Sequence, residues 1–213
     1  MTSQSLAQSE RAELCDLLDA VGPDSPTLCE GWTTRDLTAH LVVREGRPDA
    51  SAGVLVKQLE RWTEKVQNDA AKRPFPDLVD RVRSGPPRLS VFALPGVDSI
   101  ANTMEYFVHH EDVRRAQPDW QPRELPEEVR LEVWERLKAS KRMLFRSSPV
   151  HVVLQPTDLP DFELRQPPRG SVVLRGPVAE ITMHAFGREA VRDVQVLGDP
   201  ADVEAYQAVK LGM

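Results

Sequence analysis

The sequence contains little cysteine, no excess of basic residues and no long apolar segment. Its two cysteines, Cys15 and Cys29, are too few for a disulfide framework and lack the Cys-x-x-Cys spacing of a structural zinc site. A formal net charge of −6 argues against a nucleic-acid-binding surface. There is no apolar run of about 18 residues or more, and the segment MTSQSLAQSERAELC lacks the pattern of a signal peptide. We therefore expect no membrane partner and a location in the reducing cytoplasm.

The residues that are present predict a globular protein whose N-terminal part is helical. The 213 residues suffice for one large domain or two small ones, with 40% hydrophobic and 28% charged residues. Up to Ser147 the apolar residues recur with the spacing of amphipathic helices. The expected long helices are residues 4–21, 34–47, 51–72, 98–116 and 126–146, with one short helix at residues 77–83 between the third and the fourth. This pattern predicts a four-helix bundle with an additional helix.

After Ser147 the sequence changes to short β-rich runs separated by proline and glycine. These runs are residues 150–155, 161–166, 170–176 and 180–187, and a final helix is expected over 199–211. We therefore predict two domains, a helical one at residues 1–147 and a small α/β one at residues 148–213. The predicted fold class is α+β.

One of the expected helices carries three polar side chains on a single face. In the segment NTMEYFVHHEDVRRA, Glu105, His109 and Asp112 are spaced i, i+4 and i+7, so they share one side of a helix. Glu105 and His109 could hold one metal ion together, as in metal sites built inside helical bundles. His40, on the apolar side of an earlier helix, is the best candidate for a third ligand. Three protein ligands would leave one position open, as in catalytic zinc sites.

Each of these side chains also has an ordinary structural explanation. A core histidine such as His40 commonly makes only a hydrogen bond, and a Glu–His pair one turn apart is commonly a surface pair. Asp112 is expected to orient a neighbour rather than to bind a metal ion. His110, His151 and His184 have no evident partner in the sequence. The residues alone therefore leave both a metal site and a charged helix face open.

Taken together, two helical segments resemble a known family. GWTTRDLTAHL at residues 31–41 and EYFVHHEDVRRA at residues 105–116 are similar to segments of the mycothiol-dependent maleylpyruvate isomerase family, within the DinB-like superfamily. In that family a Trp-x-x-x-Asp-Leu-x-x-His-Leu helix supplies one metal-binding histidine. A Glu-x-x-x-His-x-x-Asp helix supplies a glutamate and a second histidine. VVLRGPVAEITMHAFGRE at residues 172–189 is similar to part of the family's C-terminal domain.

The resemblance implies a fold, a metal site and a type of chemistry. The implied fold is a DinB-like four-helix bundle followed by a small, sterol-carrier-like α/β domain. The implied ligands of a divalent metal, zinc or alternatively nickel, are His40, Glu105 and His109. The implied cosubstrate is mycothiol, the small thiol of actinobacteria. An isomerase or S-transferase acting on a small electrophilic or carboxylate substrate would use this combination.

Three arginines are candidates for binding carboxylates of the thiol or the substrate, because a guanidinium group pairs well with a carboxylate. Arg44 lies one turn after His40, and Arg47 shares the same face. Arg188 lies in the Gly-Arg of the C-terminal segment that resembles the family. Each of them could equally be an ordinary surface charge.

Two other interpretations remain open. The protein could be a non-catalytic metal-binding protein, or a sensor of metal or redox state, in which Asp112 or Cys29 closes the fourth position. Cys29, just before the second expected helix, is itself expected to be a small buried apolar residue. The C-terminal domain could carry an apolar ligand, although it contains few aromatic residues. Under the main interpretation the partners are a small-molecule thiol and a substrate. The sequence does not indicate an oligomeric state.

Overall fold

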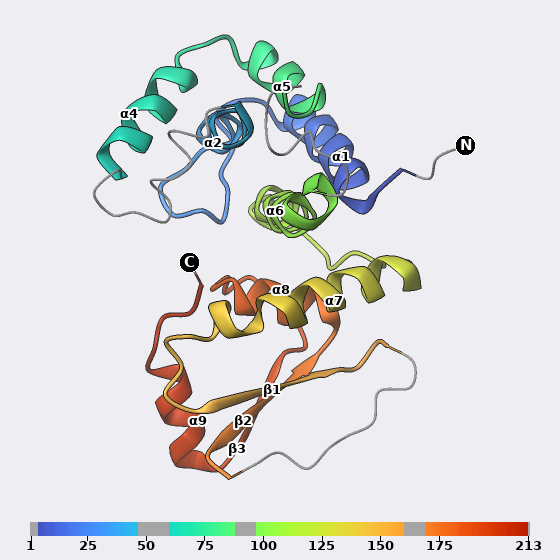
Figure 1. Ribbon diagram of the computed structural model, residues 1–213, viewed down its shortest axis with the longest axis vertical. Helices are drawn as coiled ribbons and strands as arrows, with labels where there is room; N and C mark the ends of the chain where they lie inside the picture. Colours follow the sequence, from blue (N-terminus) through green and yellow to red (C-terminus); the bar gives the residue numbers. More distant parts are fainter. Residues whose placement is uncertain (1–3, 47–59, 88–96, 160–168, 213) are drawn as a thin grey trace. The chain divides into compact units, whose positions relative to one another are not determined.

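The structure is a computed structural model that describes residues 4–46, 60–87, 97–159 and 169–212. Within these residues the chain forms eight helices and three strands, so the fold class is α+β (Figure 1). The chain divides into two compact units, Met1–Trp120 and Gln121–Met213. No helix of the described ranges has both the length and the apolar content needed to cross a bilayer.

The described residues of the first unit are helical. Its helices are α1 (Leu6–Val21), α2 (Thr34–Gly46), α4 (Glu60–Ala71), α5 (Phe75–Arg83) and α6 (Val97–Arg115). α1 packs against α5 and α6, and α2 packs against α4 and α5. Leu14, Leu37 and Tyr106 belong to one buried cluster that joins α1, α2 and α6. The sequence predicted these helices, although residues 51–59 of the expected third helix lie outside the described part.

Local sequence signals set the ends of the first two helices. Ser5 and Gln8 form a capping box at the start of α1. The helix ends before Gly22, whose φ of 79° is rarely adopted by other residues. Before α2, the carboxylate of Asp36 accepts hydrogen bonds from the backbone N–H and the hydroxyl group of Thr33. The loop between α1 and α2 is therefore fixed at both of its ends.

The second unit combines a small sheet with helices. Its elements are α7 (Glu127–Leu144), β1 (His151–Pro156), β2 (Ser171–Gly176), α8 (Val178–Ala185), β3 (Gln195–Gly198) and α9 (Pro200–Gln207). The strand order is β1-β2-β3, with β1 and β2 parallel and β3 antiparallel to β2 (Figure 1). α8 contacts β1 and β2, and α9 contacts β2 and β3. Leu154, Val172 and Leu174 are buried between these elements.

The expected strand over residues 180–187 is wrong, because most of it belongs to helix α8. α8 is buried almost all round, so it has no polar face to reveal a helical period. Its first turn is fixed by Asp158, whose side chain accepts a hydrogen bond from the backbone N–H of Val178. The short strand β3 was not predicted. The expected strand over residues 161–166 falls outside the described residues.

The division of the chain also differs from the boundary expected at residues 147/148. α7 is part of the second unit, where it packs against α8. Its apolar side, which includes Val133, Leu137 and Leu144, is buried. An amphipathic pattern shows that a helix buries one face, but it does not show which other element of the fold covers that face. For this reason the sequence alone grouped α7 with the preceding helices.

Candidate metal centre

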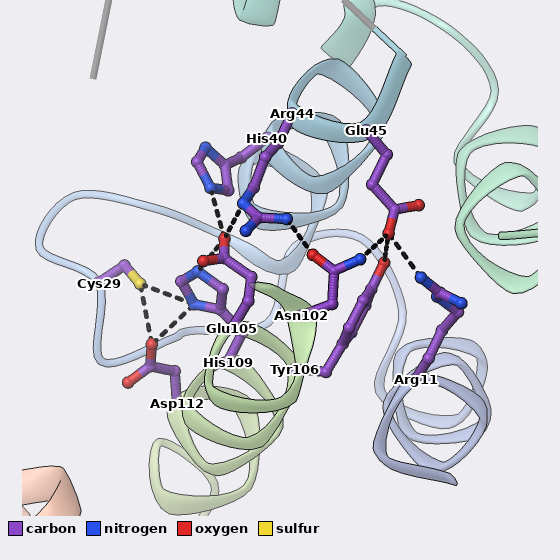
Figure 2. Close-up of polar contacts among 10 residues, drawn as sticks. All are labelled: Arg11, Cys29, His40, Arg44, Glu45, Asn102, Glu105, Tyr106, His109 and Asp112. Carbon is purple, nitrogen blue, oxygen red and sulfur yellow. Dashed lines mark hydrogen bonds and ion pairs between the residues drawn. The ribbon is translucent and has the colours of Figure 1, made fainter. Parts of the chain in front are cut away.

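The candidate centre lies in the first unit, where side chains of α2 and α6 meet (Figure 2). His40 Nε2 of α2 lies 3.2 Å from Glu105 Oε1 of α6. His109 Nε2, one turn further along α6, lies 3.3 Å from the same oxygen. The three residues proposed as ligands from the sequence are therefore brought together in space, and their donor atoms all lie within 4.8 Å of one another.

Two of the three separations between these donor atoms suit a tetrahedral zinc ion. With nitrogen and oxygen ligands at about 2.0–2.1 Å from zinc, tetrahedral geometry places neighbouring ligand atoms about 3.3 Å apart. The two His–Glu separations of 3.2 and 3.3 Å agree with this value. Two imidazoles and one carboxylate also suit zinc or nickel chemically. The side chains of His40, Glu105 and His109 are 12–19% exposed, so the group is shielded but reachable.

The carboxylate of Glu105 is held in its ionised form. Burial alone would raise the pKa of Glu105, but hydrogen bonds from His109 and His40 outweigh it and hold the pKa well below its ordinary value. The positive charge of Arg44 acts in the same direction, with its Nε 3.2 Å from Glu105 Oε1. A carboxylate that stays charged is the form that a metal ion requires.

His109 is oriented by a second carboxylate. Its Nδ1 lies 2.9 Å from Oδ2 of Asp112, whose side chain is fully buried. Burial would lower the pKa of His109, but the hydrogen bonds with Asp112, Cys29 and Glu105 raise it well above its ordinary value. A carboxylate behind a histidine fixes which ring nitrogen faces a metal ion. Asp112 therefore lies where the sequence analysis expected an orienting residue.

The loop between α1 and α2 also contributes to the centre. Cys29 Sγ donates to Asp112 Oδ2 at 3.2 Å and lies 3.8 Å from His109 Nδ1 (Figure 2). The expectation that Cys29 is a buried apolar residue is therefore wrong. Cys29 and Asp112 both lie at the Nδ1 side of His109, not at the Nε2 side that faces Glu105. An ion bound at Nε2 would thus receive no fourth ligand from either of them.

A buried polar network continues from the centre into the core (Figure 2). Arg44, besides its contact with Glu105, donates a hydrogen bond to the side-chain oxygen of Asn102. One carboxylate oxygen of Glu45 then accepts from Asn102 Nδ2 at 3.2 Å, Tyr106 Oη at 2.8 Å and Arg11 Nη2 at 2.6 Å. The sequence analysis missed this network because its members come from α1, α2 and α6, and no local spacing connects them.

The remaining candidate arginines lie elsewhere. Arg188 belongs to the second unit, where its Nη1 donates to the backbone carbonyl of Phe186 at 2.8 Å. Arg47 falls outside the described residues. Among the three arginines considered from the sequence, Arg44 is the one that the first unit places beside Glu105.

Two of the histidines without an evident partner have one in the structure. His110 Nδ1 lies 2.7 Å from Oε2 of Glu10, and both side chains are buried between α6 and α1. In the second unit, His184 Nε2 lies 3.0 Å from the hydroxyl of Tyr206. Their partners are distant in sequence, so spacing could not reveal them. Each of these two histidines therefore has a side-chain partner within its own unit.

The two thiols are expected to differ strongly in reactivity. Cys15 is fully buried, and burial raises its pKa to about 12, whereas Cys29 is partly exposed. In the folded protein a thiol reagent should modify Cys29 and leave Cys15 intact, even at pH 9. Because the pKa of Cys15 is raised by folding, its contribution to stability should fall as the pH rises above its unfolded value of about 8.5. Mass spectrometry of alkylated protein, with and without denaturant, measures both thiols, and rapid native labelling of Cys15 would contradict this assignment.

Two solved structures have a similar fold. The crystal structure of the mycothiol-dependent maleylpyruvate isomerase matches with a TM-score of 0.58, covers 90% of both chains and is 16% identical in sequence. The structure of a histidine-to-alanine mutant of that isomerase matches with the same TM-score and coverage at 15% identity. No family model and no curated protein matches the sequence. At the level of fold, the chain is therefore like the mycothiol-dependent maleylpyruvate isomerase.

Proposed function

We propose that the protein binds a divalent metal ion through His40, Glu105 and His109 and acts in thiol-dependent chemistry. The proposed ion is zinc, with nickel as the alternative. The observation that carries the proposal is the approach of both histidine Nε2 atoms to a single oxygen of Glu105. The fold likeness to a mycothiol-dependent isomerase supports it independently.

The proposed cosubstrate is mycothiol, and the proposed reaction is an isomerisation or an S-transfer on a small electrophilic or carboxylate substrate. Among the described residues, the group around Glu105 supplies three ligands, which leaves one tetrahedral position for a small molecule. A zinc ion there would lower the pKa of a bound thiol, so that the thiol reacts as a thiolate. The lack of a fourth ligand from Cys29 or Asp112 favours this proposal over a closed, non-catalytic metal site.

In this proposal, neighbouring residues orient the metal ligands and set the charge around them. Asp112 holds the ring of His109 so that Nε2 faces Glu105. Arg44 keeps Glu105 ionised and brings a positive charge to the edge of the centre. We assign Arg44 to a carboxylate of the thiol or the substrate.

The finer description of the fold is also a proposal. We propose that the helices of the first unit derive from a DinB-like four-helix bundle, and that β1 to α9, within residues 148–213, form a sterol-carrier-like domain. The likeness to the isomerase structure over 90% of both chains supports this relationship. We place the protein in the cytoplasm, where a small thiol and the two cysteine thiols would stay reduced.

Binding of mycothiol to a cobalt-substituted protein tests the proposed function. The experiment uses the Cys29→Ser variant, so that the thiolate of the added ligand is the one observed; Cys15 is buried. Titration with mycothiol should produce a thiolate-to-cobalt charge-transfer absorption that saturates at one thiol per bound ion. The change in absorption follows from a thiolate entering the open position.

The matched control is the Cys29→Ser, His40→Ala double variant, which should show no such absorption because one ligand of the centre is missing. The proposal is wrong if saturating mycothiol leaves the cobalt spectrum of the Cys29→Ser variant unchanged. A methylated mycothiol, which cannot form a thiolate, separates coordination through sulfur from binding elsewhere in the protein.

A further inference from the structure

A second group of metal-ligating atoms surrounds the other ring nitrogen of His109. Cys29 Sγ, His109 Nδ1 and Asp112 Oδ2 form a triangle with sides of 3.8, 2.9 and 3.2 Å (Figure 2). All three atoms lie within 4.8 Å of one another. They come from two segments, the loop between α1 and α2 and the last turns of α6. The proposed function makes no use of the cysteine.

The triangle does not have the geometry of a nucleophilic cysteine site. In such a site the imidazole lies between the thiol and the carboxylate, and each ring nitrogen contacts one of them. Here the thiol and the carboxylate meet the same nitrogen, Nδ1, and the thiol of Cys29 donates directly to Asp112. The Nε2 atom of His109 faces Glu105 instead. The three groups therefore converge on one point, as the ligands of a metal ion do.

The sides of the triangle are close to those of a tetrahedral site. Zinc bonds of about 2.3 Å to sulfur and about 2.0–2.1 Å to nitrogen and oxygen place sulfur about 3.5 Å from the other ligands, and nitrogen about 3.3 Å from oxygen. The observed separations differ from these values by a few tenths of an ångström in either direction. Small rotations of the side chains of Cys29 and Asp112 would cover this difference.

Charge and anchoring also suit a divalent ion. A thiolate and a carboxylate together carry two negative charges, and a neutral imidazole adds none. The side chain of Asp112 is fully buried, whereas Cys29 is partly exposed and gives an ion access from solvent. The backbone N–H of Leu28 donates to the carbonyl of Asp112 at 3.1 Å, which ties the cysteine-bearing loop to α6. The three ligands are thus held in place by the fold.

We propose that Cys29, Nδ1 of His109 and Asp112 form a second metal site, selective for a soft, thiophilic divalent ion such as cadmium. Binding releases the thiol proton of Cys29 and the Nδ1 proton of the His109 imidazolium to solvent, and the ion takes the place of these protons, bound by lone pairs of sulfur, nitrogen and oxygen. A neutral imidazole has one lone pair, so His109 serves one of the two sites at a time. An ion at Nδ1 leaves a proton on Nε2, which donates to Glu105. Because a thiolate is a soft donor, a soft ion such as cadmium should prefer this site to the open centre, whose nitrogen and oxygen donors are harder.

Cadmium titration of the metal-free protein tests this site. Wild type should develop the ultraviolet charge-transfer absorption of a cadmium thiolate, saturating at one ion per chain. Cys29→Ser should lack the absorption, and so should wild type whose Cys29 has been alkylated. His40→Ala should keep it, because His40 belongs to the open centre alone. This last variant separates a failure of the second site from a failure of the proposed function.

Cys15→Ala is the matched control for the thiol, because Cys15 is buried away from the triangle and its removal should leave the absorption unchanged. His109→Ala should weaken cadmium binding at least 10-fold, since it removes one of three ligands. The second site is wrong if cadmium gives no thiolate absorption with wild type. It is equally wrong if the absorption persists in Cys29→Ser or is lost in Cys15→Ala.

Discussion

Replacement of His109 by alanine should lower the zinc affinity of the protein at least ~100-fold, more than the loss of a residue that only supports a ligand typically costs. His109 is placed to bind an ion through Nε2 at the open centre and through Nδ1 at the second site. The variant therefore loses a ligand of both. His40→Ala and Glu105→Ala should cause a loss of the same size in the Cys29→Ser background, where the open centre alone remains.

Zinc content after purification of the untagged proteins, followed by competition with a chelator of known affinity, measures these losses. The helical circular dichroism of each variant should match that of wild type, because the three side chains are partly exposed. His151→Ala is the control, since His151 is exposed at the start of β1 in the second unit. Equal zinc retention by wild type and by the His109→Ala variant would show that the assigned ligands are wrong.

Replacement of Arg11 by methionine should lower the free energy of unfolding by about 3–5 kcal/mol, the cost of breaking a buried ion pair from one side. Arg11 and Glu45 are 6% and 4% exposed, and their charged groups lie 2.6 Å apart. Methionine fills similar space but takes the guanidinium group away from the buried carboxylate of Glu45. It also removes the contact of the guanidinium group with the ring of Tyr106, 4.5 Å from its centre.

Denaturant unfolding followed by circular dichroism gives this difference. Arg83→Met is the matched control, because Arg83 pairs with the exposed Asp16 and Asp19 and should cost less than about 1 kcal/mol. Adding Glu45→Leu to Arg11→Met should recover part of the lost free energy of unfolding, since the second change removes the buried carboxylate. A cost for Arg11→Met no larger than that for Arg83→Met would contradict the role of the buried pair.

The parts of the centre that the sequence predicted are those set by helical spacing. Glu105 and His109 lie one turn apart on α6, so any helix through them brings them to one face. The pairing with His40 on another helix rested on its position on the apolar side of that helix and on the family resemblance. Cys29 was misjudged because it lies in a loop, where no periodicity shows which way a side chain points. Whether a loop residue contacts Asp112 depends on how the loop folds back.

The errors in the fold have similar physical causes. Periodicity reveals a helix with one polar face, but α8 is buried almost all round and lacks one. The four-residue strand β3 pairs only through β2, so its formation depends on a neighbour rather than on its own residues. The buried position of Glu45 depends on Arg11, Asn102 and Tyr106 together. The local sequence around Glu45, which includes Arg44, does not indicate that this carboxylate is buried.

The stripe along α6 limits how this protein can change by insertion or deletion. Asn102, Glu105, His109 and Asp112 lie on the same side of that helix, and each contacts a side chain outside it. One residue inserted among them would rotate those beyond it by about 100° and separate the core network from the candidate ligands. A point substitution, in contrast, does not rotate these residues relative to one another. In this protein a change in the length of the eleven-residue stretch 102–112 should therefore disrupt the candidate centre.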